Sequence, residues 1–175
     1  MDLSIIPECY VDTNLIETIV PPNNRYNHQK GCGTVAKVMK ERFRDNFALG
    51  IVDKDKKEIE YLKEFTEIYS KGKLVLHKHL NRNHYIIQIF PAVERFILDA
   101  IETTNLDLTQ YDLPSSFDAF KKATKTANSK EDRRFKRLFK DLQRAGGTEL
   151  ETLASWIRYI KENRYNIDLE AIKNL

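Results

Sequence analysis

The chain has 175 residues, of which 41% are hydrophobic and 31% are charged, and its formal net charge is +3. This composition is typical of one folded domain, or of one domain with an extension, and it excludes a disordered chain. No apolar run approaches the roughly 20 residues that cross a bilayer, and the first ten residues lack the features of a signal peptide. Two cysteines, Cys9 and Cys32, are too few for the disulfide framework of a secreted domain. We therefore predict a cytoplasmic protein with no membrane partner.

The first hundred residues alternate between patterns typical of strands and of helices. A continuous apolar run from Phe47 to Val52 predicts a central strand buried on both faces. Apolar residues at helical spacing between Ile59 and Tyr69 predict a helix. In chain order, the predicted strands cover residues 3–6, 47–52, 74–77 and 84–90, and the predicted helices cover residues 12–20, 34–44, 59–69 and 91–104. This order predicts an α/β fold with a mainly parallel sheet and helices on both faces.

After residue 104 the patterns change. A turn-rich connection over residues 105–116 is followed by helical patterns only. These predicted helices cover residues 117–126, 129–144, 150–163 and about 169–175, with Ser129 as an N-cap. We therefore predict an α/β domain over residues 1–104 and a basic helical appendix over residues 117–175 that packs on it.

The predicted appendix carries an uneven charge. Residues 117–144 contain ten Lys and Arg against four Asp and Glu, whereas the rest of the chain is net negative. A basic segment beside an acidic body is a candidate surface for nucleic-acid phosphates, and a solvated helix face explains it equally well. The candidate nucleic-acid contacts are Arg133, Arg134, Lys136, Arg137 and Lys140 in this segment, and Lys54 and Lys56 elsewhere in the chain.

Acidic residues follow two of the predicted strands. Glu8 comes just after the first strand, and Asp53 and Asp55 come directly after the central one. Ligands of parallel α/β sheets bind at the carboxyl ends of the strands, where these carboxylates would repel one another. Mg²⁺ is bound by a few carboxylates together with waters and substrate phosphates. The pattern therefore predicts a site for Mg²⁺, or Mn²⁺, that serves phosphoryl chemistry, although Asp pairs are also common in turns.

Three segments resemble motifs of the Toprim family. Segment 8–12, Glu-Cys-Tyr-Val-Asp, followed by Leu15, resembles the motif Glu-Gly-x-x-Asp-x-x-x-Leu, with Cys9 in place of the glycine. Segment 47–55, an apolar strand that ends in Asp-Lys-Asp, resembles the second motif. Segment 86–94 is similar to a strand and helix in Toprim domains of overcoming-lysogenization-defect nucleases and related phage-defence proteins. The resemblance covers about residues 1–104.

This resemblance implies a Toprim- or Rossmann-like fold and metal-dependent cleavage or transfer of DNA or RNA strands, with phage defence as one setting. It implies that Glu8, Asp53 and Asp55 are catalytic and bind the metal. Glu94 would then be a ligand of a second metal, and Asp12 a supporting acid.

Two other functions are compatible with the same residues. The sequence Asp12-Thr13-Asn14 resembles the opening of PIN-domain ribonucleases. That interpretation makes Asp12 the central metal ligand and Glu8 dispensable, and it requires a strand at residues 9–11. The other alternative is a non-catalytic Toprim-like subunit that binds an ATPase partner through its helical part.

Overall fold

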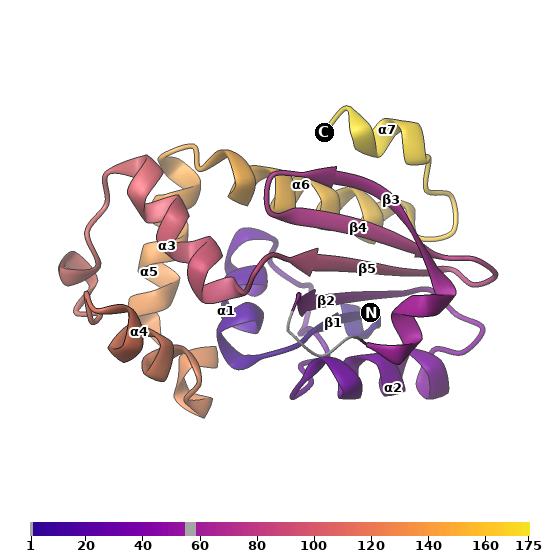
Figure 1. Cartoon of the computed structure of the whole chain (residues 1–175), viewed down its shortest axis with the longest axis horizontal. Helices are drawn as coiled ribbons and strands as arrows, with labels where there is room; N and C mark the ends of the chain where they lie inside the picture. The colour runs from indigo at the N-terminus through magenta and orange to yellow at the C-terminus, as the bar shows by residue number, and fades with distance from the viewer. Residues whose placement is uncertain (1, 55–58) are drawn as a thin grey trace.

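A five-stranded sheet with helices on both of its faces forms the centre of the molecule (Figure 1). The computed structural model describes residues 2–54 and 59–175, so the predictions for Asp55 and Lys56 lie outside the described residues. In spatial order the strands are β1 (Ile5–Pro7), β2 (Ala48–Asp53), β5 (His84–Ile89), β4 (Leu74–His79) and β3 (Phe65–Lys71). Strands β1, β2 and β5 are mutually parallel, whereas β4 is antiparallel to both of its neighbours.

The sheet is therefore mixed, and the expectation of a mainly parallel sheet is not confirmed. A turn at Gly72, whose φ is +58°, joins β3 to β4, and residues 80–83 join β4 to β5. Such short connections make antiparallel hairpins, because a parallel pair needs a crossover of a dozen or more residues. The helix predicted between Ile59 and Tyr69 is wrong. A short 3-10 helix (Glu60–Glu64) leads directly into β3, whose aromatic and β-branched residues favour a strand.

The other predicted helices are present with shifted ends. Within the described residues, the α-helices are α1 (Tyr10–Ile19), α2 (Cys32–Arg42), α3 (Val93–Thr104), α4 (Phe117–Thr124), α5 (Arg133–Arg144), α6 (Thr148–Asn163) and α7 (Leu169–Lys173). None of them is both long and apolar enough to span a membrane. Helix α5 begins later than predicted because Asp132, and not Ser129, is its N-cap. Ser129 is instead buried, and its Oγ donates to the carbonyl oxygens of Thr124 and Thr126.

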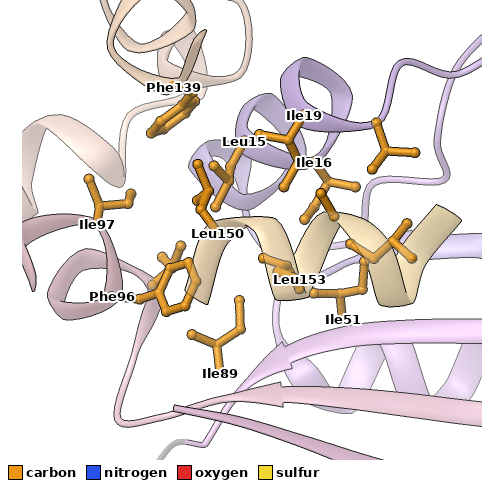
Figure 2. Packing of buried hydrophobic residues seen from close by; sticks show 14 of the residues in the cluster. Leu15, Ile16, Ile19, Ile51, Ile89, Phe96, Ile97, Phe139, Leu150 and Leu153 are labelled. Carbon is orange, nitrogen blue, oxygen red and sulfur yellow. The ribbon is translucent and has the colours of Figure 1, made fainter. Parts of the chain in front are cut away.

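Two hydrophobic clusters fix the helices on the sheet, one on each face. Because side chains alternate along a strand, Leu49 and Ile51 of β2 join the larger cluster, which also holds residues of α1, α3, α5 and α6. Ala48 and Val52 point the other way, into the cluster that α2 covers. Figure 2 shows Leu150 and Leu153 of α6 beside Ile51 and Ile89 of the sheet. The helices of residues 117–175 thus share one core with the sheet.

Candidate functional site

An acidic pocket lies at the carboxyl ends of the three parallel strands. In Figure 1 the arrowheads of β2 and β5 point toward the side where α1, α3, α4 and α5 gather. Glu8 follows β1, Asp53 is the last residue of β2, and Glu94 lies in the first turn of α3, which follows β5. All three line one pocket of about 340 Å³. The structure therefore brings together three of the predicted site residues.

Two hydrogen bonds hold Glu8 and Asp53 in place. The backbone N–H of Asp53 donates to Glu8 Oε2 at 2.9 Å, and the backbone N–H of Val93 donates to Asp53 Oδ1 at 2.8 Å. Val93 is the first residue of α3, where backbone amides have no partner within the helix. The Asp53 carboxylate supplies one of these missing acceptors. This pair of contacts ties β1, β2 and α3 together at the acids.

The C-terminal helices also reach the pocket. Glu94 is only 6% exposed, and its Oε1 accepts a hydrogen bond from Thr124 Oγ1 of α4 at 2.9 Å. Lys30, Lys121 and Lys125 line the same pocket and are exposed. Among the described residues, no ion pair within 4.0 Å joins Asp53 or Glu94 to a lysine or arginine. The pocket therefore combines one buried carboxylate, Glu94, and two half-buried ones, Glu8 and Asp53, with three exposed lysines.

The pocket disfavours negative charge on its acids. Burial, and then repulsion from Asp12, Glu8 and Glu94, raises the pKa of Asp53 to about 9, although the hydrogen bond from Val93 opposes the change. Burial is also the main reason that the pKa of Asp12 is raised to about 7. When several carboxyl groups share a desolvated site, ionising all of them costs free energy. Either a proton or a cation is therefore needed to neutralise the group.

Asp12 does not line the pocket, but its carboxylate binds Cys9, which does. Its Oδ2 accepts from the backbone N–H of Cys9 at 3.1 Å, and its own N–H donates to Cys9 Sγ at 3.5 Å. This capping box starts α1. Asp12 Oδ1 is buried with no hydrogen-bond partner in the described part of the chain. Burial and the nearby Asp12 raise the pKa of the Cys9 thiol, so Cys9 is unsuited to act as a nucleophile.

The Asp-Thr-Asn segment holds the fold together. Tyr10 and Val11 belong to α1, so the strand that the PIN interpretation requires is absent. Thr13 Oγ1 hydrogen-bonds to His28 Nδ1 and to the carbonyl of Cys9, both at 2.8 Å. Buried Asn14 donates through Nδ2 to the carbonyls of Ser129, at 2.7 Å, and Asp132, at 3.1 Å. These polar residues join α1 to the loop at residue 28 and to the start of α5.

We expect Asn14→Ala to lower the free energy of unfolding by about 1–3 kcal/mol, because two carbonyls lose their side-chain donor. Urea denaturation of the variant and the wild type measures this difference. Asn24→Ala provides the control, since Asn24 is exposed and its side chain makes no hydrogen bond within the described residues. Equal stability of the two variants would contradict the structural role given to Asn14.

In the described part of the chain, the basic residues predicted to contact nucleic acid do not line the acidic pocket. Arg133, Arg134, Arg137 and Lys140 are exposed on α5, and Lys136 is half-buried. Arg134 pairs with Asp132 at 2.7 Å, and Arg137 donates to the carbonyl of Gln110 and lies over the Tyr111 ring. Lys54 follows β2 and lies over the ring of Phe90.

Sequence reasoning missed four residues that line the pocket, namely Lys30, Lys121, Thr124 and Lys125. The last three share one face of α4 through their i, i+3 and i+4 spacing. The spacing indicates that these three side chains lie together, but it does not show which part of the fold that face of α4 contacts. Lys30 lies in a loop and carried no signal of its own.

The pocket supplies the hard oxygen donors that Mg²⁺ prefers. Among the described residues, no group of three or more His, Cys, Asp or Glu side chains could by itself hold a metal ion. Mg²⁺ does not need such a group, because it is usually bound through one or two carboxylates with waters and substrate phosphates. Glu8, Asp53 and Glu94 thus offer carboxylate oxygens for a cation that is shared with waters and a phosphate, and they do not form a closed structural zinc site.

No protein-family model, curated protein or solved structure matches this chain. The inference of function therefore depends on the pocket and on the motif residues themselves.

Proposed function

We propose that this chain is a Toprim-like, Mg²⁺-dependent protein that cleaves nucleic acid by phosphoryl transfer. The observation that carries the proposal is one pocket with three buried or half-buried carboxylates, those of Glu8, Asp53 and Glu94, and three exposed lysines. A phosphodiester is repelled by the carboxylates and attracted by the lysines. A cation between phosphate and carboxylates removes that conflict, and it also relieves the repulsion that raises the pKa of Asp53.

Each residue has a distinct role in this proposal. Glu8 and Asp53 hold the cation from β1 and β2, and Glu94, oriented by Thr124, completes the oxygen donors. Bound Mg²⁺ supplies Lewis-acid stabilisation of phosphate charge and acidifies a coordinated water. The lysines of the pocket attract the phosphate and stabilise the charge that develops on it. The role of Asp55 as a further ligand stays a prediction.

We expect Mg²⁺ and Mn²⁺ each to raise the Tm of the protein and to support cleavage of labelled DNA or RNA that EDTA stops. A cation at about 100 times its Kd adds roughly 2.7 kcal/mol of stability, which is about 5–10 °C for a chain of this size. Glu94→Gln should reduce both effects, while its amide oxygen still accepts from Thr124. Glu151→Gln removes one exposed carboxylate of α6 and should change neither.

A protein whose Tm does not respond to Mg²⁺ or Mn²⁺, and which cleaves no substrate, would contradict the proposal. That result would favour the non-catalytic binding subunit, for which the pocket is then a binding feature without a metal.

A further inference from the structure

The acidic pocket continues into a second and larger hollow along α2. This hollow measures about 900 Å³ and includes Lys37 and Lys40 of α2 and Tyr61 near β3. Glu8 and Lys30 line both hollows, so the two adjoin at these residues. We call these two hollows together the groove; its lining residues come from α2, from the ends of β1 and β2, and from α4.

Exposed lysines follow this groove from one end to the other. Lys37 lies at the α2 end, Lys30 at the junction, and Lys121 and Lys125 at the α4 end. In residues 2–54 and 59–175, none of these four lysines forms an ion pair within 4.0 Å. Lys40 differs, because it pairs with Glu64 at 3.3 Å. A groove lined by lysines that form no ion pair within the described residues is typical of a surface that binds along a phosphate backbone.

Besides Glu8, two acidic side chains line the described part of the larger hollow. Glu60 is paired with Lys63 at 3.1 Å, and Glu41 is exposed on α2. The deepest acids are those of the neighbouring pocket, for which the proposed cation supplies the compensating charge.

An aromatic ring is held rigidly at the wall of the acidic pocket. Tyr10 lines the pocket, and its ring stacks on His28 with centroids 4.6 Å apart and planes inclined by 24°. His28 is itself held by its hydrogen bond to Thr13. A fixed aromatic ring beside a basic groove is a platform on which an unpaired base can stack.

We propose that one single strand of nucleic acid lies in this groove, with successive phosphates on Lys37, Lys30, Lys121 and Lys125. The placement of its scissile phosphate over the carboxylates rests on the proposed function. A single strand fits better than a duplex because the carboxylates are buried or half-buried, so the backbone must enter the pocket to reach them. A duplex would place its second strand against the rim and leave no unpaired base for Tyr10.

The test is fluorescence anisotropy of short labelled strands, single and duplex, DNA and RNA, with uncleavable phosphorothioate linkages, in Ca²⁺ so that the carboxylates stay compensated and no cleavage occurs. We expect tighter binding of single strands. Lys30→Gln, Lys37→Gln, Lys121→Gln and Lys125→Gln should each weaken single-strand binding about three- to tenfold. Each should also reduce the magnitude of the slope of log K against log salt by about 0.7, the value for one phosphate contact. Tyr10→Leu should weaken binding without changing that slope.

The matched controls are the two single variants Lys136→Gln and Lys140→Gln on α5, each of which removes one positive charge away from the groove. The inference is overturned if these controls weaken binding as much as the groove variants do, or if duplexes bind as tightly as single strands. Cleavage in Mg²⁺ is measured separately on the wild type. If the wild type cleaves and the groove variants bind single strands as tightly as the wild type, the groove is rejected and the proposed function stays intact. Binding through the groove lysines without cleavage would support the groove and reject phosphoryl transfer.

Discussion

Asp53→Asn should reduce Mg²⁺-dependent cleavage at least about a thousandfold, equivalent to roughly 4 kcal/mol of transition-state stabilisation, while the protein stays folded. The substitution removes the charge of Asp53, but its amide oxygen can still accept from the backbone N–H of Val93. Without metal, the Tm of the variant should rise, because the amide is neutral without taking up a proton, whereas burial and nearby acids raise the pKa of Asp53 to about 9. Measurements of kcat/KM and of Tm with and without Mg²⁺ check both results.

The control for this substitution is Asp45→Asn, which removes an exposed carboxylate from the turn before β2. It should leave cleavage and the effect of Mg²⁺ on the Tm unchanged. Cleavage that survives Asp53→Asn at the wild-type rate would reject the role of the pocket in catalysis. A loss of cleavage accompanied by an equal response of the Tm to Mg²⁺ would place the cation elsewhere.

The predictable part of the fold is the part with one clear periodicity. The run from Phe47 to Val52 is apolar throughout because β2 is buried on both faces, and its strand is correctly predicted. The helix predicted over residues 59–69 is wrong because the apolar residues of this segment fit both helical spacing and the alternation of a strand. Pairing with β4 decides between them, and that pairing is made by residues distant from the segment. The mixed direction of the sheet follows from the same hairpin.

Only part of the candidate site could be predicted from the sequence. Glu8 and Asp53 each follow a strand, so their meeting at one sheet edge follows from parallel pairing of β1 with β2. Asp12 belongs to the same motif, yet its carboxylate accepts a hydrogen bond from the backbone N–H of Cys9. Cys9 is the N-cap of α1, and a side chain three residues after an N-cap can reach back to it. Thr124 and the lysines of α4 come from a helix thirty residues beyond Glu94, and only tertiary packing brings them to the pocket.

Without metal, the stability of the protein should fall as the pH rises from 7 to 9. The folded-state pKa of Asp53 is about 9, whereas an unfolded aspartate titrates near about 4. Between these values the folded state keeps a proton that the unfolded state has lost, so stability decreases by at most about 1.4 kcal/mol per pH unit. Asp12, with a folded-state pKa of about 7, is half-ionised in the folded state at the start of this window, so its own effect ends at about pH 8.

The histidines do not account for the expected change in stability between pH 7 and 9. Burial lowers the pKa of His77, His79 and His84. Their contribution to stability is therefore fully present above the ordinary histidine pKa of about 6.5 and is lost only as the pH falls below it. From pH 7 to 9, the carboxylate of Asp53 is left as the main group with a folded-state pKa inside the range.

Thermal unfolding in EDTA across pH 7 to 9 should therefore show a decrease of about 1–3 kcal/mol, or roughly 2–10 °C in Tm. Asp53→Asn should remove most of this decrease, whereas Asp12→Asn should leave most of it and alter the profile below about pH 8. Mg²⁺ should flatten the wild-type profile, because a cation that binds the ionised carboxylates favours the loss of the same proton. A wild-type profile that is flat in EDTA would mean that Asp53 is already ionised in the folded protein. The repulsion on which the cation site depends would then be absent.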